Sequence, residues 1–470
     1  MLASMDEERL LANPAFRNFW LGRLAATAAN QIFALVIGWE LYELTGSAWW
    51  LGIAGLVQFV PSLMSFLFAG DLADRVDRRL ILAGVMIAMT VMAAALWVAS
   101  LINAVSVTLL LVIGALIGLV RPFQMSAQQS LPSVLVAPRL LARAVALSSA
   151  GSQATFIVAP AIAGLVLIAG AVHVYALCTA VCFAGWWCNH RIRYNYQKPP
   201  PRPRSWQDLF GGAVFIWRRP VLLGSITLDL FAVMLAGVSG LLPVFAKDIL
   251  EADSWGLGLL RAAPAAGAVA MSVILSRWRF ERHTGRILFA SVAVFSLSLV
   301  AFGLSRDLML SLAALAVSGA ADMVSVVIRQ TLVQIDTPDV MRGRVSAFNS
   351  IAVTASNQLG DFRCGALAHL LGAVPAVIAG AAAGLVITVL LLWLAVGRAA
   401  RLGREDTKSP DWSSILRALG TWAAFALSVA LMPLLGFVVS FGLLTLALVV
   451  VLFHQPVKTA LLTAIGLSLG

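Results

Sequence analysis

Residues 121–172, which begin RPFQMSAQQSLPSVL, decide the fold of this chain because they return at residues 322–373, which begin DMVSVVIRQTLVQID. The second copy follows the first at a constant shift of 201 positions without a gap, so that Gly164 returns as Gly365. The block is far longer than a solenoid unit and is mostly apolar. Many secondary transporters consist of two similar halves, each a bundle of membrane helices. The repeat therefore predicts a duplicated, all-α membrane protein.

Composition supports lipid as the solvent. Of the 470 residues, 60% are hydrophobic and 12% are charged, and the mean hydropathy is +0.92. A soluble protein needs far more polar surface. Residues 1–9 lack the basic-then-apolar layout of a cleaved signal, so we expect the first apolar segment to stay as a membrane helix.

The net charge of +11 does not indicate nucleic-acid binding. The basic residues lie in short loops between apolar segments, where they set topology. The four cysteines show neither zinc nor disulfide spacing, so we expect no metal site, and no cofactor is expected either.

Apolar runs of about 20 residues predict twelve membrane helices in two groups of six. The expected spans are 17–42, 48–69, 80–101, 105–127, 144–169, 173–190, 220–246, 254–276, 285–304, 308–331, 344–371 and 374–397.

These spans divide the chain into five parts. We expect an N-terminal six-helix bundle (1–189), a basic, proline-rich cytoplasmic linker (190–218), a C-terminal six-helix bundle (219–397), a cytoplasmic linker (398–412) and an appended transmembrane tail (413–470). The tail holds two more apolar runs.

Most loop arginines lie on one side of the predicted bundle. They are Arg75, Arg78, Arg79, Arg139, Arg143, Arg277, Arg279, Arg282, Arg286, Arg342 and Arg344. Arginine-rich loops stay in the cytoplasm, so we expect the N-terminus and the end of the twelfth span to be cytoplasmic.

The loop after the second span reads GDLADRVDRR and resembles the major facilitator signature G-x-L-A-D-R-x-G-R-R, with Asp77 in place of its second glycine. The resemblance implies the major facilitator fold, two six-helix bundles related by a pseudo-two-fold axis. We expect Gly70 to permit close helix approach, and Arg75 and Arg78 to pair with acids across the bundle seam as a cytoplasmic latch. A purely topogenic basic loop is the alternative. The latch candidates are Gly70, Asp71, Asp74, Arg75, Asp77, Arg78, Arg79 and Arg344.

Residues 320–350, AADMVSVVIRQTLVQIDTPDVMRGRVSAFNS, resemble one branch of this superfamily: the bacterial exporters grouped with the enterobactin exporter and the drug:proton antiporter-3 proteins. The resemblance covers about residues 13–397. It implies a bacterial inner-membrane protein, monomeric, that exports an amphiphilic small molecule (a drug, a siderophore or a related metabolite) in exchange for protons.

A proton-driven exporter needs a carboxylate that takes up a proton on one side and releases it on the other. Four acids lie inside predicted spans: Asp229, Asp322, Asp361 and Glu40. Four arginines are candidate partners: Arg121, Arg261, Arg329 and Arg363. Charged side chains inside a membrane are costly, which favours a functional role for the set. For any single acid, a static structural ion pair is an equal alternative.

The positions of these acids rank them. Asp229 and Asp322 lie furthest from the predicted helix ends and are the first candidates. The repeat places Asp322 opposite Arg121, and the two charges are candidates to pair across a central cavity. Asp361 is expected to form an interhelix salt bridge with Arg363 or Arg261, and Glu40 to be an interfacial residue.

Amides on apolar spans are candidates for a substrate cavity, with helix–helix hydrogen bonding as the plainer alternative. They are Asn30, Gln31, Gln58, Gln124, Gln128, Asn357 and Gln358. The chain shows no nucleotide-binding loop and no zinc-helix signature, so we expect no enzyme activity and an ion gradient, not ATP, as the energy source.

The tail resembles the small membrane subunit of tripartite tricarboxylate transporters at Met432–Phe437, MPLLGF. We interpret the tail as a passive gene fusion or a truncation product, and its partner is unknown. For the whole chain two other functions stay open. One is an importer or uniporter of a small organic anion clamped by Arg121 or Arg329; the other is a membrane scaffold or receptor without turnover.

Overall fold

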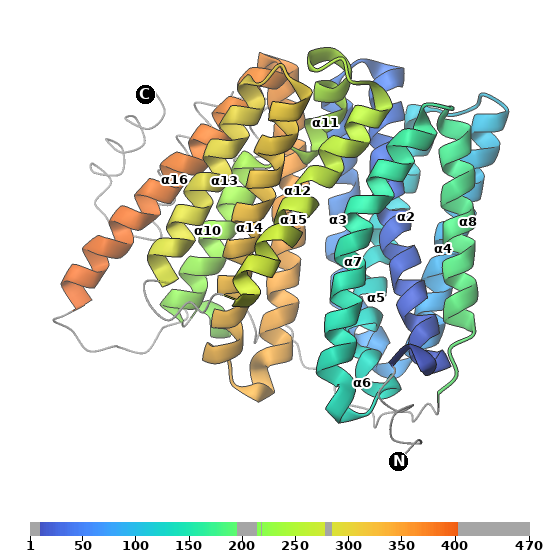
Figure 1. Ribbon diagram of the computed structural model, residues 1–470, viewed down its shortest axis with the longest axis horizontal. Helices are drawn as coiled ribbons and strands as arrows, with labels where there is room; N and C mark the ends of the chain where they lie inside the picture. Colours follow the sequence, from blue (N-terminus) through green and yellow to red (C-terminus); the bar gives the residue numbers. More distant parts are fainter. Residues whose placement is uncertain (1–9, 195–213, 218, 278–283, 403–470) are drawn as a thin grey trace.

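The computed structural model describes residues 10–194, 214–217, 219–277 and 284–402 (Figure 1). The tail at 413–470, the 398–412 linker beyond residue 402 and most of the 190–218 linker lie outside the described residues. In the described ranges the regular structure is helical throughout, as the sequence predicts.

The N-terminal half contains six long helices. They are α2 (Pro14–Thr45), α3 (Ala48–Arg75), α4 (Arg78–Leu101), α5 (Val107–Ser130), α7 (Pro138–Leu167) and α8 (Ala171–His190), with the short η1 (Leu10–Ala12) and α6 (Pro132–Leu135). Proline occupies the first turn of α2, α6 and α7, where its missing N–H costs nothing.

The C-terminal half repeats this order. It contains α10 (Pro220–Ala236), α12 (Asp253–Arg277), α13 (Thr284–Leu304), α14 (Leu308–Asp336), α15 (Asp339–Leu371) and α16 (Ala373–Leu402). The seventh crossing continues beyond α10 through η2 (Ser239–Leu241), α11 (Leu242–Val244) and the π-helix η3 (Phe245–Ile249). The twelve predicted spans each correspond to one of these crossings.

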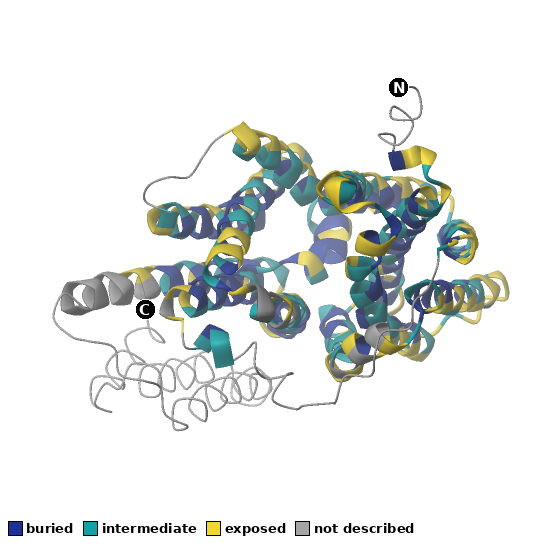
Figure 2. Cartoon of the chain, turned by 90° about the horizontal axis from the view of Figure 1, so that it is seen from below, coloured by how far each residue is buried: buried dark blue, intermediate teal, exposed yellow. Residues whose placement is uncertain are grey.

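The two ends of the molecule differ. We call the end with the α3–α4 turn and α6, at the bottom of Figure 1, the basic end, and the end with α11 the far end. Ten helical segments in the described ranges are long and apolar enough to cross a membrane. Large apolar side chains such as Val91, Leu165 and Leu297 are exposed on the outside, as lipid requires. Figure 2, viewed from the basic end, shows buried residues facing the inside of each bundle.

Glycines bring the two bundles together at the far end. A Cβ on Gly365 of α15 would lie 2.6 Å from the Cα of Gly52 of α3. A Cβ on Gly164 of α7 would lie 2.8 Å from the Cα of Gly258 of α12. Gly164 and Gly365 are the repeat-equivalent glycines, and each packs on the opposite bundle. This exchange of equivalent contacts is what a pseudo-two-fold axis produces, and small residues permit the close crossing.

Candidate functional site

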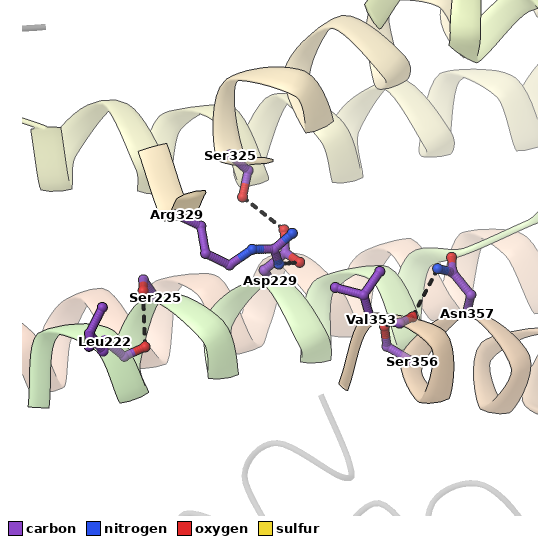
Figure 3. Close-up of polar contacts among 8 residues, drawn as sticks. All are labelled: Leu222, Ser225, Asp229, Ser325, Arg329, Val353, Ser356 and Asn357. Carbon is purple, nitrogen blue, oxygen red and sulfur yellow. Dashed lines mark hydrogen bonds and ion pairs between the residues drawn. The ribbon is translucent and has the colours of Figure 1, made fainter. Parts of the chain in front are cut away.

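A buried ion pair joins α10 to α14 in the C-terminal bundle (Figure 3). The Nη1 of Arg329 contacts the Oδ2 of Asp229, and the Ser325 hydroxyl donates to the Oδ1 of Asp229 at 2.8 Å. Asp229 and Arg329 are each only 4% exposed. Ser325 and Arg329 reach the same carboxylate because residues four apart share a helix face. The sequence identified both charges but did not pair them.

The Nε of Arg329 is buried without a hydrogen-bond partner. The ion pair therefore leaves one strong donor unused, although buried polar groups are normally satisfied.

Asp322 lies on the same face of α14, about one turn from Ser325 towards the far end. It is half-buried and near the middle of the helix. The expected pair between Asp322 and Arg121 is absent from the contacts of the described residues. Arg121 is half-buried in α5, nine residues and about 13 Å from the last residue of that helix at the basic end. The repeat located equivalent positions, but equivalence about a two-fold axis does not require contact.

Asp361 is not in the expected salt bridge with Arg363 or Arg261 in the described contacts. Its Oδ1 accepts the N–H of Gly240, the second residue of η2, at 2.8 Å. Arg261 and Arg363 act on it as nearby charges without direct contact. Arg363, two residues further along α15, faces another way and donates to the carbonyl of Gly237 at 3.3 Å.

Glu40 joins two helices of the N-terminal bundle near the far end. The Tyr175 hydroxyl of α8 donates to its Oε2. The interaction is consistent with the interfacial position expected for Glu40.

Three of the candidate amides take part in interhelix or own-helix hydrogen bonds. Asn30 donates to the Gln124 oxygen at 3.4 Å and to the carbonyl of Ala26 at 2.8 Å, while Asn357 donates to the carbonyl of Val353. The Oε1 of Gln358 is buried without a hydrogen-bond partner. The remaining candidates are half-buried: Gln31, Gln58 and Gln128.

The side chains of the loop between α3 and α4 are described only in part, and the expected latch across the seam stays a prediction. Gly70 has open space around it, not a neighbouring helix. Arg78 donates to the carbonyl of Ser130 at 3.1 Å, within its own bundle. Arg75 is exposed. The side chains of Asp71, Asp74 and Arg344 lie outside the described set.

Asp77 has a role that the glycine of the signature cannot fill. It caps α4 by accepting the N–H of Arg79 at 3.0 Å, and it forms an ion pair with the Arg79 side chain at 2.6 Å. The Tyr194 hydroxyl, which follows α8, donates to it at 2.6 Å. Burial, and next this hydrogen bond, raise the pKa of the Tyr194 phenol. Asp77 therefore ties the start of the interbundle linker to this loop.

Polar contacts at the far end were missed by the sequence analysis. The Tyr42 hydroxyl of α2 donates to Asp248 of η3, and Lys247 pairs with Glu43 at 3.3 Å and lies over the Trp39 ring at 5.9 Å. The charged residues of the turn at 247–253 were visible in the sequence, but their partners could not be predicted because they depend on how the two bundles pack.

A cavity of about 640 Å³ also lies at the far end, between the two bundles. It is lined mainly by the end of α7, the α7–α8 turn and the start of α12, with Trp39 and Trp255 among its walls. None of its lining residues belongs to the charged cluster of α10 and α14.

Comparison with known proteins agrees with this architecture. A family described as transmembrane secretion effector matches residues 9–447. The enterobactin exporter of Citrobacter koseri is 25% identical over 408 residues, which cover 86% of this chain and 96% of the relative. That of Shigella boydii is 26% identical over 394 residues, covering 82% and 93%.

Solved structures share the fold. A nucleoside transporter superposes with a TM-score of 0.66 at 11% identity, covering 81% of this chain and 99% of its own. A bacterial homologue of the human lysosomal transporter Spinster, in an inward-facing and occupied conformation, gives 0.65 at 15% identity, covering 84% and 99%. The chain belongs to the transmembrane secretion effector family of the major facilitator superfamily, and it is a multi-pass inner-membrane transporter of small molecules, not an enzyme.

Proposed function

We propose that this transporter exports an amphiphilic small molecule in exchange for protons. The observation that carries the proposal is the Asp229–Arg329 pair with its Ser325 donor, buried between two helices of one bundle. A proton on Asp229 removes the charge that holds Arg329, so protonation weakens the bridge between α10 and α14. Proton binding is thereby linked to helix packing.

The proposed orientation places the basic end in the cytoplasm because arginine-rich loops stay inside. The glycine contacts and the contacts of Lys247 and Asp248 then close the periplasmic side. This arrangement corresponds to an inward-facing state, ready to receive substrate from the cytoplasm. The halves rock about a central site near the bilayer midplane to complete export.

The substrate class is proposed from two lines of support. The curated relatives are named enterobactin exporters, which favours a siderophore, a drug or a related metabolite. The half-buried amides Gln58 and Gln128 on mainly apolar helices suit an amphiphile that needs few polar contacts.

Transport into inverted vesicles with an imposed pH gradient tests the proposal. In these vesicles the cytoplasmic face is outside, so inside-acid pH is expected to drive uptake of an exported compound. The Asp229→Asn variant is expected to lose gradient-driven uptake by at least tenfold while still equilibrating substrate. Glu251→Gln, which changes an exposed acid at the far end, is the matched control.

Three results separate the alternatives. Gradient-independent equilibration by the wild type supports a uniporter of a small organic anion and removes proton coupling. Uptake by Asp229→Asn equal to that of the wild type removes Asp229 as the coupling acid. No transport of any tested drug, siderophore or organic anion by a folded protein supports a scaffold or receptor.

A further inference from the structure

The seventh crossing is broken between α10 and η2. Helix α10 ends at Ala236, and Gly237 takes an extended conformation with φ −55° and ψ 137° before the chain resumes at Ser239. A helix end leaves carbonyls without partners, and a helix start leaves N–H groups without partners. Inside a membrane these groups are costly, so other side chains must satisfy them.

Helix α15 supplies a partner to each side of the break. Arg363 donates from Nη2 to the carbonyl of Gly237 at 3.3 Å, and Asp361 accepts the N–H of Gly240 at 2.8 Å. The signs match the helix dipoles, because a cation meets the C-terminal end of α10 and an anion meets the N-terminal end of the next segment. Two residues of one helix thus hold both edges of the break.

The packing leaves these side chains little freedom. A Cβ on Gly240 would lie 3.1 Å from the Oδ1 of Asp361, and a Cβ on Gly380 would lie 2.2 Å from the Nη1 of Arg363. Arg363 is 1% exposed, and its Nε and Nη1 have no hydrogen-bond partner. An arginine this buried and this poorly satisfied is expensive for stability alone. A functional role for its contact with the Gly237 carbonyl accounts for this cost.

The segment beyond the break makes the far-end contacts with the other bundle. It carries Lys247 and Asp248, which contact Glu43 and Tyr42 of α2. Asp361 itself packs against the other bundle, since a Cβ on Gly55 of α3 would lie 3.1 Å from its Cβ. Asp361 therefore contacts both the break in the seventh crossing and the opposite bundle at the far end.

We propose that Asp361 and Arg363 are positioning residues for the transport cycle: they fix the break at residues 237–240 so that residues 239–249 close the far end against α2. Loss of either contact frees this segment and shifts the population towards a far-end-open state. The inference rests on the proposed alternating access, and it assigns the far-end gate to a hinge in the seventh crossing.

Distances between spin labels in the full-length protein test the proposal. Labels at His173→Cys and Arg306→Cys, both exposed at the far end, report its opening. Labels at Val145→Cys and Gln334→Cys report the basic end. Both pairs are placed in a Cys188→Ser background, because Cys188 is the native cysteine that is not buried.

Asp361→Ala and Arg363→Gln are each expected to raise the open-to-closed ratio at the far end by about tenfold, the effect of losing one hydrogen bond to a charged group. Asp361→Asn keeps an acceptor oxygen for Gly240 and is expected to stay within about twofold of the wild type. The double variant is expected to match the larger single one, because both residues hold the same break. Asp336→Ala, at the basic end of α14, is the matched control.

Gly240→Ala crowds the same contact at its backbone donor without removing a charge, because the added methyl group lies 3.1 Å from the Oδ1 of Asp361. It is expected to open the far end as Asp361→Ala does. Unchanged far-end distances in folded Asp361→Ala and Gly240→Ala proteins would overturn the proposal, as would strictly additive effects in the double variant. If the distances change as expected but no pH gradient drives transport, the hinge stands and the proposed proton coupling fails.

Discussion

The two bundles hold equivalent helices together with different chemistry. In the N-terminal bundle, Gln124 of α5 accepts a hydrogen bond from Asn30 of α2 at 3.4 Å. In the C-terminal bundle, the repeat-equivalent residue is Ser325 of α14, which donates to Asp229 of α10 at 2.8 Å, beside Arg329. The first junction is neutral, and the second is charged. The contact occurs at equivalent positions of the two copies, but it is neutral in one bundle and charged in the other.

We therefore expect the junction in the N-terminal bundle to be insensitive to pH and the junction in the C-terminal bundle to respond to protonation. An amide pair keeps the same hydrogen bond at any physiological pH, whereas a carboxylate–guanidinium pair changes with a single proton. The C-terminal bundle also contains Asp322, Asp361, Arg261 and Arg363, while Arg121 is the N-terminal candidate nearest the middle of its helix. Most of the candidate coupling residues therefore lie in one bundle.

The largest effect is expected from breaking the charged junction on one side. Arg329→Gln leaves Asp229 as an uncompensated buried charge, and such losses cost about 3–5 kcal/mol. We expect a large fall in thermal unfolding temperature in detergent together with loss of transport. The double variant Asp229→Asn/Arg329→Gln removes both charges and is expected to regain most of the stability without gradient-driven transport. If the single variant is as stable as the double one, the pair does not bind the two helices.

A second test uses the symmetry of the bundle seam. Gly365→Ala and Gly164→Ala each place a methyl group 2.5–2.7 Å from the nearest backbone atom of the opposite bundle, so neither allows the present far-end closure without a shift. We expect both to favour the far-end-open state by a similar factor, measured by disulfide crosslinking of cysteines placed across the seam. Gly84→Ala, whose Cβ meets nothing within 4 Å, is the control. A strong effect of one seam variant with none from the other would show that the two crossings are not equivalent.

Sequence reasoning predicted the elements well and their contacts poorly, for a physical reason. Apolar run length determines where a membrane helix lies, so the twelve spans follow from local composition. Ion-pair partners depend on helix rotation and crossing, which composition does not encode. Arg121 and Asp322 share repeat positions yet do not pair, whereas Asp229 and Arg329 pair across different repeat positions. Asp77 was noticed as a departure from the signature, but its link to Tyr194 required the path of the chain after α8.

The smallest effects compare the equivalent residues themselves. Gln124→Ala removes a long neutral hydrogen bond and is expected to cost about 0.6 kcal/mol, the average for such bonds in membrane helices. Ser325→Ala removes a shorter bond to a carboxylate and is expected to cost about 1.7 kcal/mol, the upper end of that range. Unfolding of both variants in mild detergent measures the difference. Only Ser325→Ala is expected to alter the pH dependence of transport, because its hydroxyl donates to the Asp229 carboxylate. An equal pH shift from Gln124→Ala would mean that the neutral junction also takes part in coupling, and the division of labour between the bundles would fail.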